Sequence, residues 1–484
     1  MKRYNNPILD GVLDEFAPLA AVPRPSGHEK AVSDYLKQHL ESLGFSVVQD
    51  EVCNIIAEKP AAKGYEKAPL TILQGHMDMV CVADAGYDYT PTKDAVKLVF
   101  GEKYLEAEGT SLGADDGIGV AEAIYLLRTL KEHGRLRLIV TVDEERGMTG
   151  AVKLDAKYLE DAQFLINCDS ENYDELTIGS AGSVDLSFTR ELSRIDAQQP
   201  NAFAILVGGL LGGHSGERIG DGRGNAIRTL VLALYALKEH GALELISFSG
   251  GKARNAIPSD ARAVIRTRCT EEEVQTVLRE QKARFVSMYG NVEPRIELSA
   301  KACQTEQRPL KAGDAMRLLR LLLAFHTGVY SMSAVVPGAV ETSANLGCVD
   351  MDEERVTVQF YPRSGIDEKN DEFRLYAAEI AALTGFTAHI GIQSPVWKAN
   401  GKSRLARLMA EVFEEQNGKP MKVSAIHAGL ECSWHYRKNP NLDMVSVGVT
   451  TENIHSPQER LLLETVEPQV KMIAEAIRRI AKMG

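Results

Sequence analysis

Short runs of apolar residues recur in the first and last parts of the chain, each with the length of a buried β-strand. They occupy residues 69–73, 136–142, 163–167 and 444–449. Segments with apolar residues at helical spacing lie between them, for example 117–130 and 405–416. Alternation of strands and helices predicts an α/β sheet that is largely parallel and covered on both faces.

A further helix is expected to begin near Ser26. Ser26 and Glu29 have the spacing of a capping box, and Val32, Leu36 and other apolar residues follow at helical period. Gly44 is expected to end this helix.

The middle of the chain has a different pattern. Strand-like segments at 203–207, 261–267 and 355–361 alternate with amphipathic helices at 226–238, 271–286 and 367–383. We interpret this stretch as an inserted α+β domain that contains two comparable halves. The expected organisation is a first domain made of residues 1–185 and 397–484, interrupted by an inserted domain over 186–396.

Composition excludes several classes of protein. The 484 residues include 55 Lys and Arg against 67 Asp and Glu, a net charge of −12, which disfavours nucleic acid and anionic lipid as partners. No apolar run is long enough for a transmembrane helix, and the basic start leads into no signal-peptide core. The seven cysteines are scattered and form no CxxC pair, so neither a disulfide framework nor a thiolate zinc site is supported. We expect a reduced, cytosolic protein.

Histidine and acidic residues follow each of the four predicted strands. In chain order they are His76, Asp78, Glu144, Glu145, Asp169 and His455. Since ligand sites of open α/β sheets lie beyond the carboxyl ends of the strands, we expect these side chains to converge. A glycine-rich loop at 113–119 adds Asp115 at the start of a predicted helix. It does not complete a dinucleotide motif, because Glu122 takes the place of the last glycine.

Imidazole and carboxylate ligands without cysteine suit Zn²⁺, with Mn²⁺ or Co²⁺ as alternatives. Two such ions can share a bridging carboxylate. In extended backbone His76 and Asp78 face the same side, so His76 can bind metal while Asp78 orients its ring. The adjacent Glu144 and Glu145 point apart, which allows one to bind metal and the other to accept a proton.

Several motifs extend this pattern over essentially the whole chain, in order. They occupy residues 75–80, 110–119, 144–151, 167–171, 212–216, 254–258, 340–343, 426–432 and 455–457. Together they resemble the aminoacyl-histidine dipeptidases, cytosolic Xaa-His peptidases that hydrolyse carnosine-like dipeptides and belong to a family of di-zinc peptidases and deacylases. The resemblance implies an aminopeptidase-like catalytic domain with a mostly parallel sheet, and an α+β lid inserted into it.

The resemblance also implies a centre of two zinc ions. Asp115 would bridge the ions, His76 and Asp169 would complete one coordination sphere, and Glu145 and His455 would complete the other.

Catalytic roles follow from the same resemblance. Glu144 would act as general base for a zinc-bridged hydroxide and then as general acid, and Asp78 would orient the ligating histidine. In the lid, His214 would polarise the scissile carbonyl.

Substrate-binding roles complete the implied site. Arg363 would hold the terminal carboxylate of the substrate, Asn255 would help to grip that end, and Gly429 would line the pocket. Asp116 departs from relatives that carry Asn at this position.

The alternatives are a related amide hydrolase, such as a deacylase, carboxypeptidase or tripeptidase, and a non-catalytic peptide-binding protein on the same scaffold. The expected partner is a small peptide, without nucleic acid or membrane, and a homodimer remains open. His214 can act within one chain or across such a dimer.

Overall fold

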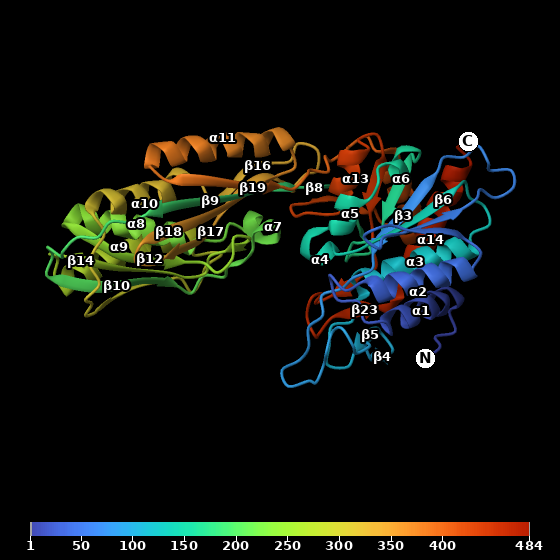
Figure 1. Cartoon of the computed structure of the whole chain (residues 1–484), viewed down its shortest axis with the longest axis horizontal. Coiled ribbons are helices and arrows are strands. Elements are labelled where there is room, and N and C mark those ends of the chain that lie inside the picture. The colour runs from blue at the N-terminus through green and yellow to red at the C-terminus, as the bar shows by residue number, and fades with distance from the viewer. Residues whose placement is uncertain (1, 484) are drawn as a thin grey trace. The chain divides into compact units, whose positions relative to one another are not determined.

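The computed structural model describes residues 2–483, which form two compact units (Figure 1). The first unit contains residues 2–180, 397–425 and 430–483, and the second contains residues 181–396 and 426–429. The chain therefore leaves the first unit after Ser180, returns at Trp397, and contributes four more residues to the second unit near its end.

An eight-stranded sheet forms the centre of the first unit, in the order β1-β2-β6-β3-β7-β21-β8-β20. The four central strands β6, β3, β7 and β21 are parallel, whereas β1, β2 and β8 pair antiparallel with their neighbours. The strands are β1 (Ser46–Gln49), β2 (Ile55–Lys59), β3 (Thr71–His76), β6 (Leu136–Thr141), β7 (Phe164–Asn167), β8 (Glu175–Ser180), β20 (Lys422–Ile426) and β21 (Asp443–Ser446).

Helices cover both faces of this sheet (Figure 1), and every residue of β3, β6 and β7 is buried as a result. The helices are α1 (Pro7–Ala20), α2 (Lys30–Ser42), α3 (Ala114–Thr129), α4 (Glu144–Gly147), α5 (Thr149–Lys153), α6 (Lys157–Glu160), α12 (Arg404–Asn417), α13 (Cys432–Lys438) and α14 (Val466–Ala481). A small antiparallel sheet also contains β4 (Leu98–Phe100), β5 (Tyr104–Ala107), β22 (Thr451–Glu452) and β23 (Arg460–Leu462).

The second unit is built on a nine-stranded antiparallel sheet, in the order β15-β10-β14-β12-β17-β18-β9-β19 with β16 beside β17. Its strands are β9 (Gly182–Glu191), β10 (Asn201–Gly208), β12 (Leu243–Gly250), β14 (Ala261–Thr267), β15 (Glu297–Ala302), β16 (Gly328–Met332), β17 (Val340–Met351), β18 (Arg355–Ser364) and β19 (Thr387–Gln393). A separate two-stranded ribbon pairs β11 (Gly213–His214) with β13 (Ala256–Ile257).

Helices pack on one face of the nine-stranded sheet. They are α8 (Ala226–His240), α9 (Glu271–Tyr289), α10 (Ala312–Ala324) and α11 (Asp367–Thr384), while the short α7 (Ser215–Arg218) follows β11. Strands such as β14 alternate buried and more exposed residues because only one face is covered. Val184, Leu186 and Phe188 of β9 point to the helices and join Leu230 and Phe373 in one core.

The predicted α/β sheet with an inserted α+β domain is confirmed, and most elements lie within a few residues of their expected places. The helix expected at Ser26 is an exception. Helix α2 begins at Lys30 with Glu29 as N-cap and no side-chain cap. Ser26 instead donates a hydrogen bond to Asp78 Oδ2 at 2.8 Å, so its hydroxyl serves the strand end rather than the helix.

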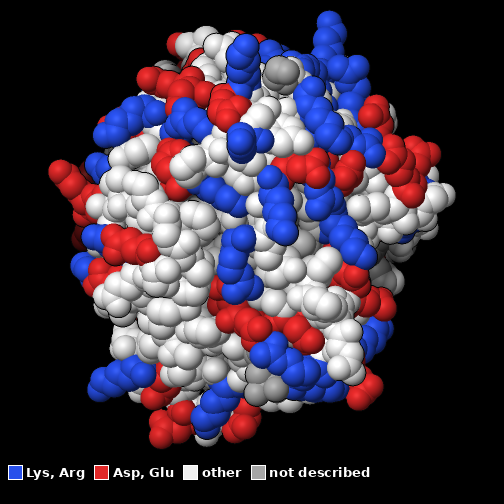
Figure 2. Space-filling model, turned by 90° about the vertical axis from the view of Figure 1, so that its right-hand side faces the viewer, with Lys and Arg blue, Asp and Glu red and all other residues white. Residues whose placement is uncertain are grey.

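The net negative charge is not gathered on the face of the first unit shown in Figure 2, where acidic and basic side chains are interspersed. Among residues 2–483, none of the helices has both the length and the apolar character that a bilayer span requires.

Candidate metal and catalytic site

The carboxyl ends of the parallel strands bring the predicted metal ligands of the first unit together. His76 is the last residue of β3, Asp169 stands two residues after β7, and Glu144 and Glu145 open α4 shortly after β6. Asp115 lies at the start of α3. The covered sheet thus fixes the backbone on which the ligands stand.

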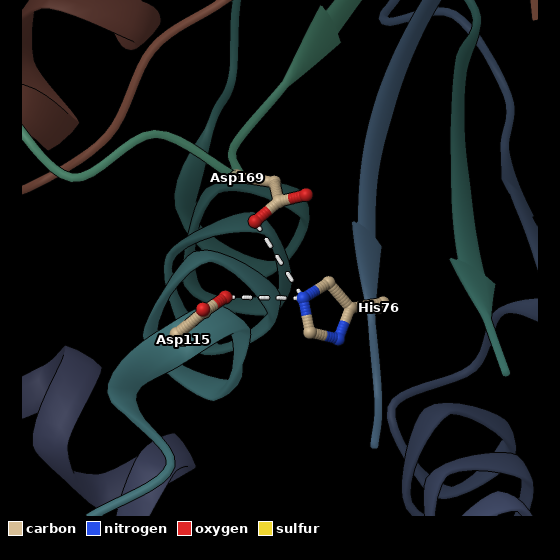
Figure 3. A group of neighbouring side chains, drawn as sticks. All are labelled: His76, Asp115 and Asp169. Atoms are coloured by element: carbon tan, nitrogen blue, oxygen red, sulfur yellow. Dashed lines mark hydrogen bonds and ion pairs between the residues drawn. The ribbon is translucent and has the colours of Figure 1, made fainter. Parts of the chain in front are cut away.

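Three sets of three side chains have ligand atoms close enough to hold a metal ion. The first set is His76, Asp115 and Asp169, the second is Asp115, Glu145 and His455, and the third is His76, Glu144 and Glu145. In the first set, His76 Nε2 lies 3.1 Å from Asp115 Oδ1 and 3.5 Å from Asp169 Oδ1 (Figure 3). In the second, His455 Nε2 lies 3.2 Å from Asp115 Oδ2 and 2.9 Å from Glu145.

Asp115 belongs to the first and second sets and presents a different carboxylate oxygen to each histidine. This arrangement suits a carboxylate that bridges two cations. Hydrogen bonds from His455 and His76 hold the pKa of Asp115 well below its usual range, despite its burial. Hydrogen bonds that the His455 ring donates to the Asp115 and Glu145 carboxylates raise the pKa of His455 to about 11.

The donor set has the chemistry of a divalent metal centre. Burial, followed by the charge of Asp169, raises the pKa of Glu144 well above its ordinary value. Burial also raises the pKa values of Asp169 and Glu145, and Asp115 adds to both shifts. Such crowding of acidic groups is relieved when cations bind among them, so these residues fit two divalent ions.

Asp78 lies behind His76, as its sequence spacing suggests. Asp78 Oδ1 is 3.5 Å from His76 Nδ1, and the carboxylate accepts hydrogen bonds from the backbone N–H groups of Glu144 and Glu145. Burial would raise the pKa of Asp78, but hydrogen bonds from His76, Ser26 and the Glu144 backbone bring it below its usual range. The Asp78 carboxylate therefore contacts both the ring of His76 and the backbone that carries Glu144 and Glu145.

Asp116 has a contact that sequence reasoning did not find. Its Oδ2 accepts a hydrogen bond from the backbone N–H of His76 at 3.2 Å. A Cβ atom at Gly75 or Gly119 would come within 2.2 Å of the Asp116 carboxylate. These two glycines thus leave room for a buried carboxyl group behind the ligands.

Glu431 is a second buried acidic group near the strand ends. Its carboxylate accepts hydrogen bonds from Gln74 Nε2 and Thr141 Oγ1, both at 2.6 Å. Burial raises the pKa of Glu431 to about 7. It lies in the motif at 426–432, but no periodic pattern in the sequence reveals these partners.

The second unit holds the other predicted site residues. Arg363, on β18, is 5% exposed and its guanidinium lies 4.9 Å from the centre of the Tyr361 ring. Among the described residues it forms no ion pair with a carboxylate, although burial lowers its pKa. A buried cation in this state is suited to bind an anionic ligand.

His214 and Asn255 are brought side by side in this unit. His214 pairs with Ala256 in the β11–β13 ribbon, and the next residue, Ser215, donates its backbone N–H to the Asn255 carbonyl oxygen at 2.8 Å. Burial, followed by the charge of Arg363, lowers the pKa of His214, which keeps the imidazole neutral near pH 7.

Gly429 is partly buried at the end of the short segment 426–429. In the same segment, His427 Nε2 lies 2.7 Å from Ser343 Oγ. Burial and the charge of Arg363 lower the pKa of His427 to about 3. His427 is thus a second neutral histidine near Arg363, and the sequence alone indicates no role for it.

Comparison with known proteins is consistent with this geometry. Residues 72–479 match the model of peptidase family M20/M25/M40. The chain is 34% identical over 470 residues to the cytosol non-specific dipeptidase of Escherichia coli (strain K12), with 96% of this chain and 97% of the relative covered.

Solved structures show the same similarity. The aminoacylhistidine dipeptidase of Vibrio alginolyticus matches with a TM-score of 0.90 and 32% identity, covering 97% of this chain and 96% of that one. An aminopeptidase of Bacillus cereus matches with a TM-score of 0.57 and 16% identity over 98% and 99% of the two chains, which shows a shared fold.

Proposed function

This chain belongs to peptidase family M20/M25/M40, and from that premise we propose that it is a metal-dependent dipeptidase that hydrolyses Xaa-His dipeptides. The E. coli relative and the V. alginolyticus structure, which are more than 30% identical to this chain over nearly their whole length, are named as dipeptidases, the second as an aminoacylhistidine dipeptidase. The observation that carries the proposal is the pair of ligand sets that share Asp115, with the carboxyl group of Glu144 outside that pair but close to His76 and Glu145.

The proposed cofactor is two Zn²⁺ ions per chain, with Co²⁺ or Mn²⁺ as possible substitutes. His76, Asp115 and Asp169 would hold one ion, and Asp115, Glu145 and His455 would hold the other. When bound, such ions polarise a carbonyl oxygen and make water acidic enough to attack near neutral pH.

Glu144 supplies the proton transfers. It accepts a proton from the attacking water and returns it to the nitrogen of the leaving amino acid. The Asp78 carboxylate accepts a hydrogen bond from the Glu144 backbone N–H at 3.1 Å, which holds α4 in place. A raised pKa, due mainly to burial, suits a carboxylate that must take up a proton during the reaction.

Residues of the second unit bind and polarise the substrate in this proposal. The guanidinium of Arg363 is suited to the terminal carboxylate of a dipeptide. His214, kept neutral by burial and by Arg363, can donate a hydrogen bond from its ring N–H to the oxygen that gains charge. Asn255 and Gly429 are assigned to the walls of the same substrate site.

Metal analysis combined with a substrate panel tests the proposal. Purified protein should bind two equivalents of Zn²⁺ and release histidine from Gly-His and β-Ala-His. It should act more slowly on acetyl-histidine and on tripeptides that end in histidine. Preference for the acetylated amino acid or the tripeptide would favour a deacylase or a tripeptidase. Absence of both metal and turnover would overturn the enzyme and favour a peptide-binding protein.

The proposal places the enzyme in the cytoplasm, in keeping with the name of the E. coli relative. A homodimer is also proposed. The edge strand β19 has no charged residue and exposes Ile390 and Ile392, which are 39% and 82% exposed. Unprotected edge strands are ready to pair with another chain. Ile392→Lys should convert a dimer into a monomer in light scattering, whereas a monomeric wild type would refute the dimer.

A further inference from the structure

The loop that carries the shared ligand Asp115 is held by two buried side chains of opposite charge. One is Glu459, which is 3% exposed and lies four residues after His455. The other is Arg24, which is 1% exposed and lies in the connection between α1 and α2. Neither residue belongs to a set that could hold metal in the described residues.

Glu459 accepts four hydrogen bonds from consecutive backbone N–H groups. Its Oε2 accepts from Leu112 and Gly113 at 2.8 and 2.9 Å, and its Oε1 accepts from Ala114 and Asp115 at 2.8 and 3.3 Å. These are the N–H groups at the beginning of α3, where a negative charge is favourable. One carboxylate thus fixes the backbone of the whole turn that ends at Asp115.

Arg24 holds the other side of this turn. Its guanidinium donates to the carbonyl oxygens of Met77 and Asp78 at 2.8 and 3.1 Å, and to that of Gly113. A Cβ atom at Gly113 or Gly117 would lie 2.5 Å from Arg24 Nη2. The glycines of this loop therefore make room for the guanidinium, which connects the end of β3 to the Asp115 loop.

We infer that Glu459 is a positioning residue that fixes the separation of Asp115 and His455, and thereby the affinity of one of the two metal positions. The inference rests on the proposed function, since it concerns the same metal centre. His76 and Asp169 stand at the ends of β3 and β7, where the sheet fixes them. In contrast, Glu459 is the direct connection from the His455 loop to the backbone of Asp115.

Loss of Glu459 should therefore weaken the two metal positions unequally. The set of Asp115, Glu145 and His455 would lose the placement of two of its three ligands, whereas the set of His76, Asp115 and Asp169 would lose that of one. Loss of a residue that orients a metal ligand commonly costs about 10- to 100-fold in metal affinity.

Calorimetric titration of metal-stripped protein with Zn²⁺ tests the inference, with Glu459→Gln as the variant. The amide keeps the size of the side chain but places an NH₂ group against N–H donors. We expect one equivalent to bind within about threefold of wild type and the other to bind about 10- to 100-fold more weakly. Selective loss of one equivalent separates a positioning role from general destabilisation.

Asp443→Asn is the matched control. The Asp443 carboxylate accepts hydrogen bonds from the backbone N–H groups of Arg404 and Leu405, at 2.8 and 3.1 Å, at the beginning of α12. It stands at the amino end of β21, so the same chemical change should leave both equivalents intact. If Glu459→Gln does not fold, Glu459→Asp is the second variant, because it keeps the negative charge on a side chain that is one methylene shorter. It should lower the affinity for the same one equivalent of Zn²⁺ by a smaller factor.

The outcomes separate this inference from the proposed function. Suppose that the wild type binds two equivalents of Zn²⁺. If the Glu459 variant then binds both with unchanged affinity, or binds both more weakly by the same factor, only the role of Glu459 is overturned. A wild type that binds fewer than two equivalents overturns the proposed metal centre and this inference together.

Discussion

His455 Nε2 lies 2.9 Å from the Glu145 carboxylate, although 310 positions of sequence separate the two residues. Glu145 stands in α4 beyond the end of β6, and His455 lies in the connection between β22 and β23. The contact joins the early and late parts of the first unit at one of the candidate ligand sets. The two side chains form an ion pair in the structure, and the Asp115 and Glu145 carboxylates raise the pKa of His455 to about 11.

The first prediction concerns Glu144→Gln. The amide cannot accept a proton, so kcat should fall about 10²- to 10⁴-fold, the contribution of a positioned general base. Metal content should remain near that of the wild type, because Glu144 belongs to neither of the two sets that share Asp115 and groups only with His76 and Glu145. Hydrolysis of Gly-His and the metal content of dialysed protein are the measurements. Turnover within tenfold of wild type would assign the proton transfers to another group.

The convergence of the ligands could be predicted because the strands are apolar and each ends in a polar residue. Burial on both faces favours apolar residues in β3 and β6, and the parallel order carries His76 and Glu144 to one edge. Local signals were less reliable. Ser26 has capping-box spacing, yet its hydroxyl is directed to Asp78.

The supporting charges could not be predicted from the sequence. Arg24 and Glu459 are single residues in loops, without period or motif, and their partners lie far away in the chain. Their roles depend on which backbone groups remain unpaired once the sheet and α3 have formed. Such information resides in the fold and not in the local pattern.

Arg363→Met tests whether the guanidinium binds the terminal carboxylate of the substrate. A charge-assisted hydrogen bond contributes about 1.5–3 kcal/mol, so kcat/KM for Gly-His should fall about 10- to 150-fold. The same substrate with an amidated C-terminus should be a poor substrate of the wild type and should be affected little by the substitution.

Arg355→Met provides the control for this experiment. Arg355 begins the same strand β18 but is exposed, so its removal should leave kcat/KM unchanged for both the free and the amidated substrate. If Arg363→Met still discriminates between the free and the amidated C-terminus, another residue binds the carboxylate.

His214→Ala should lower kcat more than it changes KM. Burial and the charge of Arg363 lower the pKa of His214, so its neutral ring can donate a hydrogen bond at pH 7. Loss of one donor to a developing oxyanion costs about 10²- to 10³-fold in kcat. Steady-state kinetics with Gly-His measure the effect, and His240→Ala, at the exposed end of α8, should behave as wild type. A rise in KM alone would indicate a binding role instead.

His435 makes the stability of the first unit sensitive to acid. It is 0% exposed, and burial lowers its pKa from 6.5 to about 3. As the pH falls below 6.5, His435 becomes protonated in the unfolded chain but stays neutral in the folded chain. The stability that depends on neutral His435 is therefore complete above about pH 6.5 and is lost as the pH falls toward 3.

His435→Leu should remove this dependence. Between pH 7 and pH 5, protonation of the unfolded histidine costs the wild type about 2 kcal/mol of stability, and the variant should lose about 2 kcal/mol less. Trp397 and Trp434 both lie in the first unit, so their fluorescence during urea unfolding reports its stability. His28→Leu, at an exposed position, should keep the wild-type dependence. Equal losses in wild type and His435→Leu would show that His435 can be protonated within the fold.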